Sequence, residues 1–279
     1  MSTVAKLLWI LESRFHEPIT LDELVTVTGK SRTYLSRIFP MVTGYSITAY
    51  LRARRLTEAA RQLAAGAPDI LSVALDAGYG SHEAFTRAFR DQFGITPELL
   101  RRRRSLDDIL LVEPLRMNTQ ANTTLTPPRF EDRPPMRFAG IAQRHQMSHA
   151  AGIPAQWQSF QPYVGNLDGA VGGAAYGLVG EAAPDCDDFE YVVAMEVKPG
   201  AEVPSALATV EVPALRWARF THSGDVTSLR STIGAAADWL AEHGHEASEA
   251  SYSFVEYYGP AFDPLRGSGD VEVWFGLKR

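Results

Sequence analysis

The front of this chain contains an ungapped repeat of fifty residues. When each residue is set beside the one fifty positions later, the matching pairs include Ser31 and Ser81, Arg37 and Arg87, Phe39 and Phe89, and Gly44 and Gly94. A repeat in such close register indicates one structural unit used twice. The first hundred residues are therefore expected to fold as two copies of the same small motif.

Each copy predicts two helices joined by a tight turn. In the first copy, Thr20 is followed three residues later by a glutamate, which is the pattern of a capping box at the start of a helix. Gly29 ends that helix, and Ser31 caps the next one. In the second copy, residues 78–80 form a glycine-rich turn and Ser81 is the cap. Helix, short turn and capped helix together make a helix-turn-helix.

The segment between the two copies, residues 46–63, is predicted to be one long helix because it lacks glycine and proline and repeats apolar residues at helical spacing. Such a helix spans about 27 Å at 1.5 Å per residue. The major groove of B-DNA recurs about every 34 Å along one face. A rigid connector of this length allows one chain to present two recognition helices to successive grooves.

Charge is distributed unevenly along the chain. Residues 1–104 carry a net charge of +5, whereas residues 105–279 carry −11, within a total of −6. A basic front and an acidic rear favour contact of the front alone with a polyanion. Chance scatter of surface charge is the alternative, so the motifs must decide.

The second copy resembles a known family of regulators. Its motifs are Ala77-Gly78-Tyr79-Gly80-Ser81, Phe85-Thr86-Arg87-Ala88-Phe89-Arg90, Phe93-Gly94-Ile95-Thr96-Pro97 and the basic run after Leu100. Together they are similar to the AraC/XylS family, and the resemblance covers about residues 4–104. It implies sequence-specific binding to double-stranded DNA by two helix-turn-helix units joined by a long helix.

The residues expected to meet DNA match the family's base-reading positions on the two recognition helices. They are Arg32, Thr33, Ser36 and Arg37 in the first unit, and His82, Glu83, Thr86 and Arg87 in the second. An arginine can pair with guanine or with phosphate, and a glutamate can accept from a cytosine amino group. The alternative is that these side chains form merely solvated faces, and for Ser36 and Glu83 the two interpretations are evenly matched.

Three features bear on how this DNA-binding half works. Pro40 stands where the family usually has lysine, and it is expected to end or bend the first recognition helix early. Thr33 is small where some relatives have an aromatic residue, so readout by the first unit is the less certain of the two. The run Arg101–Arg104 either adds phosphate contacts or is a solvated helix end.

The predicted organisation is two domains. An all-α tandem helix-turn-helix domain covers residues 1–104, a linker covers 105–127, and an α+β domain covers 128–279. The rear domain contains two strand-helix-strand-strand repeats. Its predicted strands are 137–145, 174–181, 189–198, 207–221 (interrupted at Pro213), 251–258 and 271–277, and its predicted helices are 153–160 and one capped by Asp225 and stopped by Gly244.

This order resembles the gyrase-inhibitor-like effector-binding domain. The likeness is carried by Ile153-Pro154 with Trp157 and Phe160, Tyr176-Gly177, Phe220-Thr221-His222-Ser223-Gly224, Trp239-Leu240 and Phe254-Val255-Glu256-Tyr257-Tyr258. Joined to an N-terminal double helix-turn-helix, it is similar to the architecture of Rob-type regulators. The resemblance implies a cleft between the two repeats that binds small cationic or lipophilic molecules, and no cofactor.

Glu256 is the leading candidate for an effector contact. It lies between Phe254 and Tyr258 on a predicted strand, so the three side chains share a face. A carboxylate among aromatic rings suits a cation, by charge and by cation–π attraction. Candidate walls of the same pocket are Trp157, Tyr176, Trp217 and Trp274. For any single aromatic residue, a plain core position is the better interpretation.

Other chemistries find little support in the sequence. His145 and His149 have helical metal spacing but fall at a strand end, and the acidic stretch 185–190 is better explained as a solvated loop than as a calcium site, so no metal is expected. No apolar stretch reaches membrane length, and no signal peptide precedes the first helix. The single cysteine, Cys186, favours a reducing compartment, and hence the cytoplasm.

The sequence therefore predicts a transcription regulator that is not an enzyme, whose partners are DNA, a small-molecule effector and RNA polymerase. Two alternatives for the rear domain stay open. It could hydrolyse its ligand with Glu256 as general base, because some isolated relatives of this fold are hydrolases. It could instead be a module that binds another protein.

Overall fold

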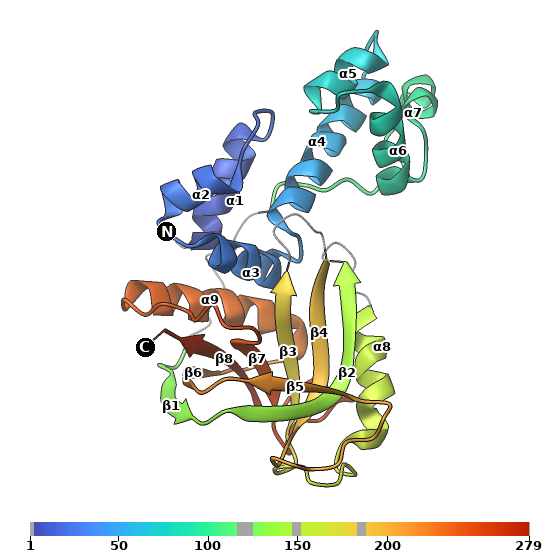
Figure 1. Cartoon of the computed structure of the whole chain (residues 1–279). Coiled ribbons are helices and arrows are strands. Elements are labelled where there is room, and N and C mark those ends of the chain that lie inside the picture. Colours follow the sequence, from blue (N-terminus) through green and yellow to red (C-terminus); the bar gives the residue numbers. More distant parts are fainter. Residues whose placement is uncertain (1–2, 116–124, 147–151, 183–187, 279) are drawn as a thin grey trace. The chain divides into compact units, whose positions relative to one another are not determined.

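The computed structural model describes residues 3–115, 125–146, 152–182 and 188–278 (Figure 1). Contacts divide the chain into two compact units, which are described separately. One unit comprises residues 1–29 and 47–117, and the other comprises 30–46 and 118–279. The helix that carries the first predicted recognition face thus groups with the rear of the chain.

Seven helices occupy the front of the chain. They are α1 (Thr3–Arg14), α2 (Leu21–Thr28), α3 (Arg32–Thr43), α4 (Ile47–Ala64), α5 (Ile70–Asp76), α6 (His82–Phe93) and α7 (Pro97–Arg103). The predicted caps are confirmed. Thr20 and Glu23 form a capping box, and the hydroxyls of Ser31 and Ser81 accept from backbone N–H groups three residues later, at 3.2 and 3.1 Å.

Pro40 is expected from the sequence to end or bend α3 early, and the expected early end is wrong. The helix continues through Pro40 to Thr43 and ends at Gly44, whose φ of 80° lies in the left-handed region. The Gly44 N–H donates to the carbonyl of Pro40 at 2.7 Å. Proline lacks one N–H donor, but only three helical residues follow it, so the lost hydrogen bond does not prevent the last turn from closing.

The second repeat packs its helices on the C-terminal half of α4. Leu56 and Leu63 of α4, Val73 of α5, and Phe85 and Phe89 of α6 belong to one buried cluster. The exposed leucines of α5 lie outside it, and the buried face of that short helix is formed instead by Ile70, Val73 and Ala74. The connector helix therefore serves as the core of this repeat, which holds α6 at a defined angle.

A buried network of charged and polar side chains joins α4 to α1. Arg54 is 3% exposed and pairs in a two-pronged manner with Glu12 of α1, at 2.9 and 3.0 Å. The Tyr50 hydroxyl donates to the same carboxylate at 2.6 Å. Burial, with the neighbouring carboxylate, raises the pKa of Tyr50, so its hydroxyl stays protonated as a donor.

The segment after α7 is fastened along α4. The carbonyl of Val112 accepts from Arg54 at 3.0 Å, and its N–H donates to the Thr57 hydroxyl at 3.1 Å. Glu113 pairs with Arg61 at 2.7 Å. The front part of the predicted linker is therefore packed against this helix, and residues 116–124 lie outside the described part of the chain. The predicted domain boundaries stay a prediction.

The rear unit contains one antiparallel sheet of eight strands. They are β1 (Arg129–Arg133), β2 (Met136–Gln146), β3 (Ala175–Ala182), β4 (Asp188–Val197), β5 (Ala208–Val212), β6 (Leu215–Thr221), β7 (Phe254–Tyr258) and β8 (Val271–Leu277). Their order is β1-β6-β8-β7-β3-β4-β2-β5. The two strand-helix-strand-strand repeats are confirmed, since β3-β4-β2 is mirrored by β7-β8-β6 about the central β3–β7 pair (Figure 1).

Two helices accompany the sheet, α8 (Ile153–Phe160) and α9 (Leu229–Glu242). Pro154 lies in the first turn of α8, as predicted. Asp225 caps a short 3₁₀ turn, Val226–Ser228, that leads directly into α9. The opposite face of the sheet carries a separate buried cluster that includes Phe138, Trp217 and Trp274.

Among the helices of the described residues, none combines the length and apolar character needed to cross a membrane.

We expect Glu12→Ala to destabilise the helical front unit by about 3–5 kcal/mol, because it leaves the buried Arg54 guanidinium without its carboxylate. Urea denaturation of the full chain, followed by circular dichroism at 222 nm, measures the loss. The matched control is Glu17→Ala, which removes an exposed pair with Arg14 and should cost ~0–1 kcal/mol. Equal costs for the two variants would contradict a structural role for the buried network.

Candidate functional site

Helix α6 presents a basic and polar face at the start of the second recognition helix. Phe85 and Phe89 are fully buried, with ring centroids 5.4 Å apart, and they anchor the opposite side. His82, Glu83 and Arg87 are exposed, as the sequence predicted. The Glu83 backbone N–H and the Ser81 hydroxyl lower the pKa of the Glu83 carboxyl, which keeps it ionised as an acceptor.

Thr86 does not fit the predicted base-reading role. Its hydroxyl is buried, and no described residue forms a hydrogen bond with it. Thr86 is half-buried, whereas the other three predicted residues of this helix are exposed. A hydroxyl directed into the core is not available to a base edge, so α6 offers three of its four predicted contacts.

The arginine run after Leu100 is largely engaged within its own unit. Arg101 donates to the Pro68 carbonyl and pairs with Glu98, both at 3.0 Å. Arg103 pairs with Asp108 at 3.1 Å. Arg102 is exposed. Arg101 and Arg103 therefore hold α7 and the following turn, and Arg104, like Arg102, is exposed.

The first recognition helix, α3, has a different environment. Arg32 and Thr33 are exposed, but Ser36 and Arg37 line a cavity of the rear unit. One guanidinium nitrogen of Arg37 donates to the Ser253 hydroxyl and, at 3.3 Å, to the carbonyl of residue 248. Two of the four residues predicted to read DNA in this unit thus face the rear domain.

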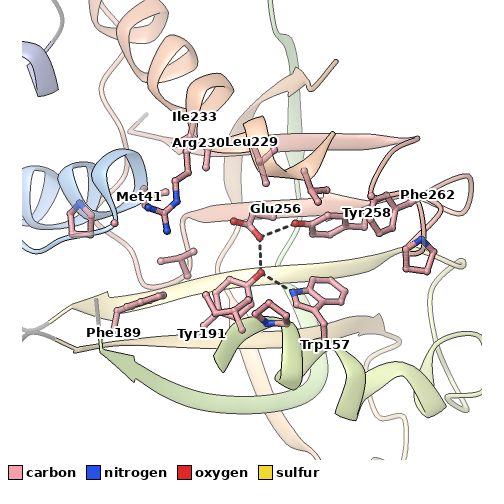
Figure 2. Close-up of a pocket in the computed structure, with 18 of the residues that line it drawn as sticks. Met41, Trp157, Phe189, Tyr191, Leu229, Arg230, Ile233, Glu256, Tyr258 and Phe262 are labelled. Carbon is pink, nitrogen blue, oxygen red and sulfur yellow. Dashed lines mark hydrogen bonds between the residues drawn. The ribbon is translucent and has the colours of Figure 1, made fainter. Parts of the chain in front are cut away.

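The cavity has a volume of about 970 Å³, which is at the upper end of the range for small-molecule sites (Figure 2). Its walls come from α3, α8, α9, strands β3, β4 and β7, and the loop before β8. They include Pro40, Met41, Ile153, Pro154, Trp157, Val179, Phe189, Tyr191, Leu229, Arg230, Ile233, Glu256, Tyr258, Phe262 and Leu265. The walls are mainly apolar and aromatic, and the described residues contribute a single carboxylate to them.

Glu256 is that carboxylate, and it is held by hydrogen bonds to one of its two oxygens. Oε2 accepts from the hydroxyls of Tyr191, at 2.6 Å, and Tyr258, at 3.1 Å (Figure 2). The indole N–H of Trp157 donates to the Tyr191 hydroxyl at 3.2 Å. No described residue donates to Oε1 of Glu256. The half-buried side chain therefore offers one acceptor oxygen to the cavity.

Removal from water raises the pKa of Glu256 above its ordinary value of 4.5, while the two tyrosine hydroxyls and the charge of Arg230 offset part of this effect. Burial and the same carboxylate raise the pKa values of Tyr191 and Tyr258 well above 10, so both remain protonated donors. The carboxylate is held in place by its neighbours but is not neutralised by an ion pair with a described cation.

Gly177 makes room for this cluster. It pairs with Glu256 across the β3–β7 ladder. A Cβ at this position would lie 2.8 Å from Oε2 of Glu256 and would collide with the Tyr191 hydroxyl. The absence of a side chain on β3 thus allows a tyrosine from β4 to reach a carboxylate on β7.

The structure brings together three of the seven predicted effector residues, namely Glu256, Trp157 and Tyr258. Tyr176, Trp217 and Trp274 do not line this cavity, because they lie in the buried cluster on the other face of the sheet. Phe254 shares the face of Glu256 but packs against Phe275, with ring centroids 5.0 Å apart. The expectation that these four form walls of the Glu256 pocket is therefore corrected.

Sequence reasoning missed Tyr191, Arg230 and the contribution of α3. Alternation along β4 places Phe189 and Tyr191 on one face, but only the pairing of strands shows that this face is the one shared with Glu256. Arg230 lies in the first turn of α9, where nothing local distinguishes it from a solvated residue.

No group of three or more potential metal ligands is found among the described residues. His145 is buried, with Nε2 2.6 Å from Oε1 of Gln156, which indicates a structural role. His149 and Cys186 lie outside the described residues, as do residues 185–187 of the acidic stretch 185–190.

The chain matches the models of two known protein families. A helix-turn-helix domain model matches residues 24–103, and a model of the GyrI-like small molecule binding domain matches residues 126–278. The second match covers more than half of the chain.

Similar proteins include regulators of transcription. The chain is 41% identical over 111 residues to the transcriptional regulator Rob of Salmonella typhimurium, which covers 40% of this chain and 38% of Rob. It is 38% identical over 95 residues to the regulatory protein SoxS of Escherichia coli strain K12, covering 34% of this chain and 88% of SoxS. It is 40% identical over 103 residues to the transposon Tn10 TetD protein, covering 36% and 74%. The match thus spans less than half the length of Rob.

We expect Glu256→Gln to raise the melting temperature of the ligand-free chain at pH 7.5. The pKa of this carboxyl is higher in the folded chain than its ordinary value of 4.5 in the unfolded chain. Its ionisation therefore lowers the stability of the fold as pH rises from the unfolded pKa through the folded pKa. Glutamine keeps an acceptor for the tyrosines and removes the charge. A stabilisation of 1 kcal/mol would correspond to about 2–4 °C for a domain of this size.

Differential scanning fluorimetry from pH 4 to pH 8 checks this, with Glu202→Gln at an exposed position as the matched control. The gain should shrink toward pH 4, where the native carboxyl is protonated. A melting temperature that falls on substitution would mean that the charge supports the fold rather than a ligand.

Proposed function

Because this chain belongs to the AraC/XylS family and carries a GyrI-like small molecule binding domain, we propose that it binds specific DNA sites and regulates transcription in response to a molecule bound in the Glu256 cavity. RNA polymerase is the proposed protein partner, since a regulator of this family acts on transcription.

One observation carries the ligand proposal. Within a mainly apolar cavity, the Glu256 carboxyl has an acceptor oxygen to which no described residue donates, and it stands among the rings of Trp157, Tyr191 and Tyr258. A carboxylate that is only partly compensated by its neighbours is costly to bury, and a cation that fills the site offsets this cost. The proposed effector is therefore a lipophilic cation.

The proposed DNA contacts lie at the start of each recognition helix. In the second unit these are the exposed His82, Glu83 and Arg87. In the first unit they are Arg32, Thr33, Ser36 and Arg37, and the last two can reach DNA only when α3 leaves the cavity wall. The exposed arginine and polar groups on α6 support base readout, and Arg102 supports a phosphate contact.

For DNA, we expect Arg87→Ala to cost ~1–3 kcal/mol on a duplex selected by the full chain from a random library, if Arg87 contacts a base. Fluorescence anisotropy on the selected duplex and on a random duplex measures both affinities. Arg14→Ala, which removes an exposed arginine of α1, is the matched control for loss of charge. Equal losses on the two duplexes would assign Arg87 to phosphate alone, and failure to select any duplex would refute the DNA-binding proposal.

For the effector, we expect tetraphenylphosphonium to bind the full chain and to quench tryptophan fluorescence through Trp157, whereas the neutral triphenylphosphine oxide binds weakly. Glu256→Gln should reduce the affinity for the cation by roughly tenfold or more, which corresponds to ~1.4 kcal/mol. Affinity should fall as pH drops through the raised pKa of Glu256, because protonation removes the charge that attracts the ligand.

Gly177→Ala supplies a second test that keeps the charge. It should also lower the affinity for the cation, because the added Cβ displaces the Tyr191 hydroxyl. Gly173→Ala, where an added Cβ makes only ordinary contacts, should leave that affinity unchanged. If neither compound binds, or if both bind equally to the chain and to Glu256→Gln, the cationic effector is excluded. Turnover of a phenyl ester that disappears in Glu256→Gln would instead favour a hydrolase.

A further inference from the structure

Helix α3 forms one wall of the effector cavity. It packs along α9 within the rear unit, and the cavity wall that it contributes consists of Ser36, Arg37, Pro40, Met41 and Gly44. In the close-up, Met41 of α3 and Arg230 of α9 border the space that Glu256 faces (Figure 2). The same helix is the first predicted DNA-reading element of the chain.

Two contacts hold α3 at this wall. The Arg37 guanidinium donates to the Ser253 hydroxyl and to the carbonyl of residue 248. At the other end of the helix, the Arg230 guanidinium fills the space beside Gly44, where any side chain would collide with it. A cation next to the C-terminal end of a helix is stabilised by the helix dipole.

We propose that α3 is shared between DNA and the effector domain, so that a ligand in the cavity and DNA at the first recognition helix oppose each other. The inference rests on the proposed function. A guanidinium bonded to Ser253 and to the carbonyl of residue 248 is not free to read a base, so the docked state withholds Arg37, and with it Ser36, from DNA.

The direction of the coupling follows from the shape of the cavity. The space of about 970 Å³ exists with α3 in place, so a ligand can enter without displacing the helix. A ligand that fills the cavity contacts Pro40 and Met41 in the wall formed by α3, and these contacts exist only while α3 is docked. It therefore binds the docked state more tightly and shifts the population toward it. By linkage, DNA lowers the ligand affinity by the same factor.

The test measures the affinity of the full chain for its selected duplex with and without saturating tetraphenylphosphonium. We expect the cation to weaken DNA binding by about five- to fiftyfold, within the usual range of coupling between sites. Ser253→Ala removes a hydroxyl that accepts from Arg37. Ser253 does not line the cavity and does not belong to the predicted DNA-reading set. The substitution should tighten DNA binding without the cation and reduce the effect of the cation. Ser205→Ala, at an exposed position, is the matched control.

Hydrogen exchange of peptides that cover 32–43 gives a readout that needs no DNA, and its comparison of variants needs no ligand. Exchange in α3 should be faster in Ser253→Ala than in Ser205→Ala, and the cation should slow it in the unmodified chain. If DNA and cation both bind but neither changes the affinity for the other, the coupling is refuted while the proposed function stands. If α3 exchanges equally in both variants, the docked helix is refuted, whether or not the cation binds.

Discussion

The pairing of β3 with β7 is the constraint on which the rear domain depends. It joins the two strand-helix-strand-strand repeats into one sheet and sets Gly177 opposite Glu256. Because that position on β3 has no side chain, the Tyr191 hydroxyl of β4 reaches the carboxylate of β7. A shift of one residue in this register would turn Glu256 to the opposite face and remove its carboxylate from the cavity.

The same carboxylate sets a conflict between folding and binding. Burial among aromatic rings raises the pKa of Glu256, so ionisation of this carboxyl opposes folding. Two tyrosine hydroxyls stabilise the charge in part, and they satisfy one oxygen while leaving the other to the cavity. A site that is fully satisfied by the protein would gain little from a ligand, whereas this one has unmet binding capacity.

The front of the chain shows how one helix can serve several purposes. The C-terminal half of α4 is the core on which α5 and α6 pack, and its N-terminal half holds the buried pair of Arg54 and Glu12. The segment after α7 is fastened to the same helix through Val112. The part of the predicted linker up to Glu113 therefore belongs to the packed front unit, although its composition indicates a linker.

Local patterns were sufficient to predict most elements, because caps, turns and alternation act over a few residues. They located the helices at Ser31 and Ser81, the order of the rear strands, and Glu256 as a carboxylate among aromatic residues. They were not sufficient to say which aromatic side chains meet that carboxylate, or that Arg37 contacts Ser253. Those facts depend on which strands are neighbours and on where α3 packs, and both are set by contacts between residues far apart in the chain.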